Sequence, residues 1–233
     1  MSLDAITVAV DFGAASDRAL EMAGSLARAL GATLRLLHVE QLEMPPYFTS
    51  EQLAALDRER AAVRAQAHQF LKRHGQRFTT VPFTTVVEDR APVEAILHQQ
   101  DDADLLVMGT NGRRGPRRWW LGSVAEQVID ASRRPVLVVR ADSPVPGPDR
   151  PFDRILLETG PPGSEPTPAE RLAGEMARTL GSTIVESAGR PLCDVLSGSG
   201  ASLVVVSGGP SAQESLLRTC ATPILFVPPA IRS

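Results

Sequence analysis

The chain has 233 residues, 43% of them hydrophobic, which is enough for one large domain or two small ones with apolar cores. Its formal net charge of −3 argues against a general attraction to nucleic acid or to an anionic membrane. Two cysteines exclude a disulfide framework, and no apolar run approaches the roughly 20 residues that span a bilayer. The N-terminus also lacks the pattern of a signal peptide, so we expect a cytoplasmic protein.

Short apolar runs alternate with amphipathic segments in the first 141 residues. Five of these runs are predicted as buried strands: Ile6–Val10, Thr33–Val39, Phe83–Val87, Leu105–Met108 and Val136–Val139. Strands that alternate with helices in this way predict a parallel sheet that is covered on both faces.

The segments between the strands carry helix start and stop signals. The first helix is expected to start at the N-cap Ser16 and to end at Gly31. The second is expected to start at about Ser50 and to end at Gly75, with Phe70 among its inward residues. The third opens with Pro92 at its first position, and the fourth opens at Ser123. Ligands of such sheets bind at the carboxyl ends of the strands, which places Asp11, Val39 and Met108–Gly109 beside one crevice.

A proline-rich stretch at residues 142–151 is predicted as a linker, after which the chain partly repeats itself. The segment Ser123–Val139 aligns with Ser211–Val227 without a gap, and Leu30–Thr33 resembles Leu180–Thr183. The second copy is shorter, and we expect it to lack one strand, the long helix and most of the glycine-rich loop. Its counterpart of Asp11 falls near Gly160 or Pro161, so the carboxylate is absent.

The first copy keeps a glycine-rich segment between a strand and a helix. Gly109 and Gly112 follow the fourth strand, and Gly122 and Ser123 precede the fourth helix. Glycines allow the backbone to approach an anion, and a helix N-terminus offers unpaired N–H groups, so this order favours a phosphate site over turn formation alone. Ser123-x-x-Glu126 also reads as a capping box, which is compatible with phosphate binding. No activating partner suggests that Ser123 is a nucleophile, and the four histidines lack metal-site spacing.

The loop at residues 113–120 is basic and aromatic, and it has three interpretations. Arginines such as Arg113 could neutralise a triphosphate. The loop could bind nucleic acid by arginine contacts and aromatic stacking, which the sequence favours least. It could also be a solvated loop whose tryptophans pack on the domain.

Together these motifs resemble the universal stress protein family. The resemblance rests on Asp11 after a strand, on the spacing G-x-x-G-(nine residues)-G-S from Gly109 to Ser123, and on the continuation through Arg134-Pro135 to Arg140. It covers residues 3–141 well and residues 152–228 weakly. The glycine spacing is typical of the ATP-binding branch of that family. One departure is the Phe12-Gly13-Ala14 segment, where the family usually has a Gly-Ser pair.

The resemblance implies an open α/β sheet of the Rossmann-like, adenine nucleotide alpha hydrolase-like type, and an ATP site with Mg²⁺. It implies that Asp11 contacts the ribose or adenine side and that the backbone of Val39 contacts adenine. Met108 and Gly109 would line the nucleoside pocket. The implied phosphate contacts are Gly112, Gly122, Ser123 and Val124, with Arg113 as a further candidate.

The leading hypothesis is therefore a tandem protein with a nucleotide-binding domain at residues 1–141, a linker at 142–151 and a degenerate domain at 152–233. It would act as a stress-response regulator and not by turnover, because no P-loop lysine or general base is visible. An interaction protein that binds no nucleotide is the alternative. A nucleotidyl- or phosphoryl-transferring enzyme is a weaker third reading.

The last strands of the two copies, Val136–Val139 and Ile224–Val227, are expected to pair within the chain. Each would otherwise be an apolar sheet edge, which is prone to association. Pairing would give a compact particle, and the sequence leaves open whether two chains also form a homodimer.

Overall fold

The structure is a computed structural model that describes residues 3–40, 50–110, 121–147, 149–160, 163–213, 216 and 220–229, without the side chains of residues 50–57, 59, 211 and 212. The first half of the chain contains β1 (Ala5–Ala9), α1 (Ala14–Leu30), β2 (Thr33–Val39), α2 (Ser50–Phe78), β3 (Phe83–Glu88), α3 (Pro92–His98), the 3₁₀ helix η1 (Gln99–Asp102), β4 (Leu105–Thr110), α4 (Ser123–Ala131) and β5 (Val136–Arg140). The second half contains β6 (Arg154–Leu157), α5 (Pro168–Leu180), β7 (Thr183–Glu186), α6 (Leu192–Ser199), β8 (Leu203–Ser207), the 3₁₀ helix η2 (Pro210–Gln213) and β9 (Ile224–Val227).

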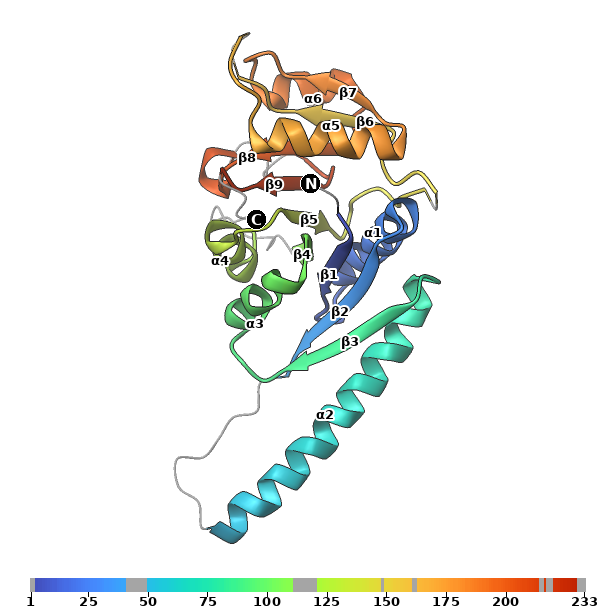
Figure 1. The fold of residues 1–233 in the computed structure, drawn as a ribbon, viewed down its shortest axis with the longest axis vertical. Coiled ribbons are helices and arrows are strands. Elements are labelled where there is room, and N and C mark those ends of the chain that lie inside the picture. The colour runs from blue at the N-terminus through green and yellow to red at the C-terminus, as the bar shows by residue number, and fades with distance from the viewer. Residues whose placement is uncertain are drawn as a thin grey trace.

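The strands form one nine-stranded sheet in the order β3-β2-β1-β4-β5-β9-β8-β6-β7 (Figure 1). Neighbouring strands are parallel except β5 and β9, which pair antiparallel with Leu137 opposite Leu225. The mixed α/β class with a mostly parallel open sheet is therefore as the sequence predicts. Because β5 and β9 run in opposite directions, the carboxyl ends of β1–β5 and those of β6–β9 lie at opposite edges of the sheet.

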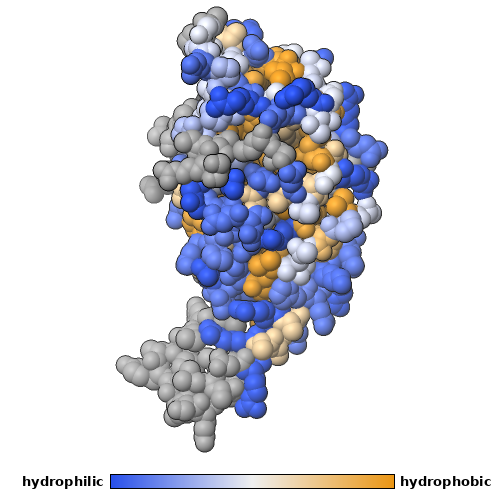
Figure 2. All heavy atoms as spheres, in the orientation of Figure 1, coloured by the Kyte–Doolittle hydropathy of each residue, from blue (hydrophilic) through white to orange (hydrophobic). Residues whose placement is uncertain are grey.

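Helices cover both faces of the sheet with apolar side chains. Residues of α1 and α5, together with Leu71 of α2, belong to one buried cluster, whereas α3, α4 and α6 contribute to a second cluster on the other face. On the surface, hydrophobic residues are interspersed among hydrophilic ones on the face that Figure 2 shows. Within the described residues, no helix is both long enough and apolar enough to cross a membrane.

Hydrogen bonds from backbone N–H groups to a side chain recur at matching places in the two halves. The side chain of Asp104 accepts from the N–H groups of Asp4 and Ala5, and the hydroxyl of Ser202 accepts from those of Asp153 and Arg154. Each of α1 and α5 ends at a glycine in the left-handed conformation, Gly31 with φ 69° and Gly181 with φ 67°. The strand order β7-β6-β8-β9 repeats β2-β1-β4-β5. The second half has no strand equivalent to β3 in this order, because the chain passes from β7 to α6 through residues 187–191.

The second helix differs from its sequence prediction at two positions. Gly75 does not end it, since α2 continues to Phe78. A Cβ atom at Gly75 would lie 2.6 Å from Cδ2 of Leu36 and 2.7 Å from Cζ of Phe83, so glycine allows the helix to pack closely on β2 and β3. Phe70 is not inward, because half of its surface (50%) is exposed. By contrast, Pro92 opens α3 as predicted.

Candidate functional site

A cavity of about 670 Å³ lies at the carboxyl ends of β1, β2 and β4, a volume within the range of small-molecule sites. The N-terminal parts of α3 and α4 close its sides. The lining residues are Ala9, Val10, Asp11, Ser16, Leu37, His38, Val39, Pro92, Ile96, Met108, Gly109, Thr110, Leu121, Gly122, Ser123, Val124 and Ala125. Seven of the predicted site residues are among them: Asp11, Val39, Met108, Gly109, Gly122, Ser123 and Val124. The other two, Gly112 and Arg113, lie outside the described residues, as do both tryptophans of that loop.

Helix α4 points its N-terminus into this cavity without a side-chain cap. Its N-cap residue is Gly122, which has no side chain to cap the N–H groups of the first helical turn. The predicted capping box is therefore wrong: Ser123 is the first helical residue, and the N–H of Glu126 donates to the carbonyl of Gly122 at 3.0 Å. The first N–H groups of a helix have no intrahelical acceptor and carry the positive end of the helix dipole. This end of the cavity is suited to an anion.

The two glycines that flank the loop lie in different surroundings. A Cβ atom at Gly109 would lie 2.4 Å from the backbone of Ala15 and Ser16, so this glycine lets β4 pack against the start of α1. Gly122 has φ −64° and ψ 148°, a conformation open to any residue, and among the described residues a Cβ there would meet only Thr110 Oγ1, at 3.9 Å, within 4 Å. Neither backbone conformation nor packing thus requires glycine at position 122, and the space beside it belongs to the cavity.

Thr110 is a lining residue that the sequence did not single out. Its buried hydroxyl accepts a hydrogen bond from the N–H of Gly122 at 3.1 Å. This contact fixes the start of α4 to the end of β4 across the loop. The only feature of the sequence that could have indicated a role for Thr110 in the cavity is its position directly after Gly109, at the end of a predicted strand.

Asp11 lies in a turn that three local hydrogen bonds close. Its Oδ1 accepts from the N–H of Gly13 at 2.9 Å, and its own N–H donates to Oγ of Ser16. Ser16 in turn donates to the carbonyl of Gly13, which is the N-cap residue of α1. The prediction that Ser16 is the N-cap is therefore wrong, because its side chain closes the turn that carries Asp11. The Asp11 side chain is exposed at the mouth of the cavity.

The backbone of Val39 faces the cavity side of β2. The N–H of Glu40 donates to the carbonyl of Glu88 on β3, and alternate residues of a parallel strand bond to opposite neighbours. The N–H and carbonyl of Val39 therefore point toward β1, which has already ended at Ala9. The apolar side chains of Leu37, Ile96 and Met108 line this part of the cavity, so it offers a backbone edge beside an apolar wall.

The cavity has little to hold a metal ion by protein ligands alone. Asp11 is the only acidic side chain among its described lining residues. Of the residues that the structure describes, no group of three or more histidine, cysteine, aspartate or glutamate side chains could hold a metal. Mg²⁺ in nucleotide sites is bound by one or two carboxylates and by phosphates, so an ion here would depend mainly on the phosphates of a bound nucleotide.

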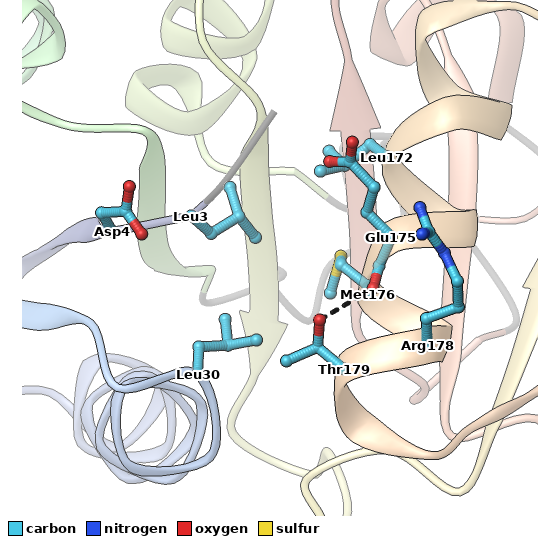
Figure 3. A pocket seen from close by; sticks show the side chains of 8 residues that line it. All are labelled: Leu3, Asp4, Leu30, Leu172, Glu175, Met176, Arg178 and Thr179. Atoms are coloured by element: carbon cyan, nitrogen blue, oxygen red, sulfur yellow. Dashed lines mark hydrogen bonds between the residues drawn. The ribbon is translucent and has the colours of Figure 1, made fainter.

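A second hollow of about 300 Å³ lies where the two halves meet (Figure 3). Leu3 and Leu30 face Leu172 and Met176 of α5 across it, and the hydroxyl of Thr179 donates to the backbone carbonyl of Glu175. It lies at the amino end of β1 and has neither a glycine-rich loop nor a helix N-terminus, so it lacks the features of an anion site.

Sequence comparison gives matches to universal stress proteins. A universal stress protein of Methanocaldococcus jannaschii is 41% identical over 70 residues, which are 30% of this chain and 36% of that protein. Universal stress protein E of Salmonella typhi is 39% identical over 83 residues, which are 35% of this chain and 26% of that protein. The matched segments thus span well under half of these relatives.

The fold has a matching solved structure that spans the whole chain. The crystal structure of a universal stress protein from Archaeoglobus fulgidus superimposes with a TM-score of 0.62 over 99% of this chain and 100% of that one, at 18% identity. A family model described as the universal stress protein family matches residues 3–140, more than half of the sequence. The chain therefore belongs to the universal stress protein family.

Proposed function

We propose that the first half binds ATP in this cavity and that the protein acts as a nucleotide-dependent regulator of a stress response. The observation that carries the proposal is Gly122, which borders open cavity at the uncapped N-terminus of α4. The phosphates would accept hydrogen bonds from the N–H groups of Ser123 and Val124. Gly112 and Arg113 are proposed as further phosphate contacts.

The nucleoside would occupy the other end of the cavity. The N–H and carbonyl of Val39 suit an adenine edge, which presents both acceptors and donors, and the apolar wall of Leu37, Ile96 and Met108 suits its faces. Asp11 would accept from a ribose hydroxyl with Oδ2, because Oδ1 is held by Gly13. Mg²⁺, where it accompanies the nucleotide, would be held mainly by the phosphates.

We propose regulation by binding and not turnover. Among the described residues that line the cavity, no lysine is present and Asp11 is the only carboxylate. A phosphoryl-transfer site needs cations on the phosphates and a group that positions the nucleophile. Any hydrolysis at this site should consequently be slow.

We propose that the chain divides into a nucleotide-binding domain at residues 1–141, a linker at 142–151 and a degenerate domain at 152–233. The recurring hydrogen bonds and the repeated strand order support this division. The antiparallel pair of β5 and β9 would hold the two domains together in solution.

The degenerate domain carries its own carboxylate where the first domain has its cavity. By strand register Glu158 corresponds to Ala9, a residue that lines the cavity. Its Oε2 accepts from the N–H of Ser207 at 3.0 Å, and its Oε1 accepts from Nε2 of Gln213 at 2.9 Å. By the same register Gly160 corresponds to Asp11. We therefore propose that the second domain binds no nucleotide, because Glu158 lies at this position and a glycine stands in place of Asp11.

Calorimetric titration with ATP tests the proposal. We expect one molecule of ATP per chain, because Glu158 lies where the first copy has its cavity. Two molecules per chain would contradict the assignment of a degenerate domain. No binding would favour the alternative, an interaction protein that keeps the loop only for structure.

A further inference from the structure

Phe12 adopts a backbone conformation that disfavours a side chain. It has φ 61°, and among the described residues only it and Ala188 are non-glycine residues with positive φ. The left-handed region is unfavourable for residues other than glycine and persists where the surroundings hold it in place. Phe12 directly follows Asp11 in the turn at the mouth of the cavity. Contacts that fix the conformation of Phe12 therefore also restrict the position of Asp11.

An aromatic cluster at the rim of the cavity surrounds this ring. The centroid of Phe12 lies 4.6 Å from that of His38 on β2, 4.7 Å from that of Phe70 and 5.0 Å from that of His74, both on α2. The contacts with Phe70 and His74 are edge-on, an arrangement that aromatic rings favour. The cluster runs from the surface to the core: Phe70 is half exposed, whereas His74 is buried and Phe12 packs against the large buried cluster. It therefore anchors this turn to the core.

Hydrogen bonds hold both histidines of the cluster. Nδ1 of His38 lies 2.8 Å from the carbonyl of Val10, and Nε2 of His74 lies 2.7 Å from Oδ1 of Asp17 in the first turn of α1. The ring of Phe12 thus packs against two histidines whose hydrogen bonds are to both sides of the turn. His38 contacts Val10, which precedes Asp11, and His74 contacts Asp17 of α1, which follows it.

We propose that Phe12 is a positioning residue that fixes the Asp11 carboxylate for a nucleotide ribose and couples it to α2. The inference rests on the proposed ATP site. Because Oδ1 of Asp11 is held by Gly13, a fixed turn directs Oδ2 toward the ligand without further ordering. Loss of the ring would leave the turn free to take other conformations, which lowers affinity although no ligand contact is removed.

The test measures ATP affinity by calorimetry in four variants. Phe12→Gly relieves the left-handed conformation but removes the ring, and we expect about tenfold weaker binding, measured at a temperature where the variant is folded. Phe70→Ala removes one partner from α2, outside the cavity lining, and should weaken binding about threefold. Phe12→Tyr keeps the ring and should bind within about twofold of the wild type. Ala188→Gly is the matched control, since it relieves the same kind of strain in the second half and should leave affinity unchanged.

Affinities of Phe12→Gly and Phe70→Ala that stay within about twofold of a wild type that binds ATP would overturn this inference alone. Equal weakening by Ala188→Gly would also overturn it, since relief of strain would then explain the effect. Failure of the wild type to bind ATP would overturn the proposed function and this inference together.

Discussion

Gly122→Val is expected to lower ATP affinity by at least about 100-fold while the fold persists. The valine side chain would occupy the space beside the N-terminus of α4, where the phosphates are proposed to accept hydrogen bonds. Each hydrogen bond to a charged group contributes about 1.5–3 kcal/mol, so loss of one or two accounts for this factor. The fold should persist because Gly122 has an ordinary backbone conformation and because Thr110 Oγ1 is the sole atom of the described residues within 4 Å of a Cβ at this position.

Two further variants make this result specific. Gly122→Ala adds a single methyl group and should cause a smaller loss, about tenfold. Gly198→Val adds the same bulk at an exposed position of α6, where a Cβ meets no atom of the described residues within 4 Å, and should bind ATP as the wild type does. Unchanged affinity in Gly122→Val would show that the phosphates bind elsewhere.

Gly109→Ala is expected to destabilise the protein by about 3 kcal/mol, at the upper end of the usual effect of overpacking. Its Cβ would lie 2.4 Å from backbone atoms of Ala15 and Ser16, and backbone cannot move aside as the end of a flexible side chain can. Either β4 or the start of α1 must then shift. For a chain of this size the melting temperature should fall by about 10 °C, which calorimetry or circular dichroism measures.

Gly122→Ala is the control for this prediction as well, because it alters the other end of the same loop and should leave the melting temperature unchanged. If both alanine variants had melting temperatures near that of the wild type, the close approach of β4 and α1 would not explain why position 109 is glycine. If both were strongly destabilised, both glycines would serve packing, and the argument from Gly122 would fail.

The strands were predictable because buried parallel strands are nearly continuous apolar runs. Thr33–Val39 coincides with β2, and the runs at Leu105 and Val136 mark the starts of β4 and β5. Their order along the chain also predicts which ends meet, so Asp11 and Val39 could be assigned to one cavity before any contact was known.

Helix starts were less predictable, because a serine near a helix start fits several roles. Ser16 and Ser123 both precede an amphipathic run, which favours an N-cap, yet a glycine takes that place in each case. At Ser16 the hydroxyl closes the turn of Asp11, and at α4 the absence of a cap leaves the N–H groups available. Both departures from helix preference occur beside the cavity, as expected where function competes with local stability.

Contacts between distant residues could not be read from local patterns. Gly75 resembles a stop signal because nothing near it in the sequence reveals that Leu36 and Phe83 lie against it. The role of Phe12 depends on His38 and Phe70, which are far from it along the chain. Such positions become interpretable only when the fold brings their partners together.

Hydrogen exchange of the backbone amides, with and without ATP, tests the central claim most directly. We predict that ATP slows exchange at Leu121–Ala125, at Val10–Asp11 and at Val39, and leaves Glu158–Gly160 unchanged. Protection at the carboxyl end of β6 and β8, or at none of these segments under saturating ATP, would contradict the assignment of the nucleotide site to the first half of the chain.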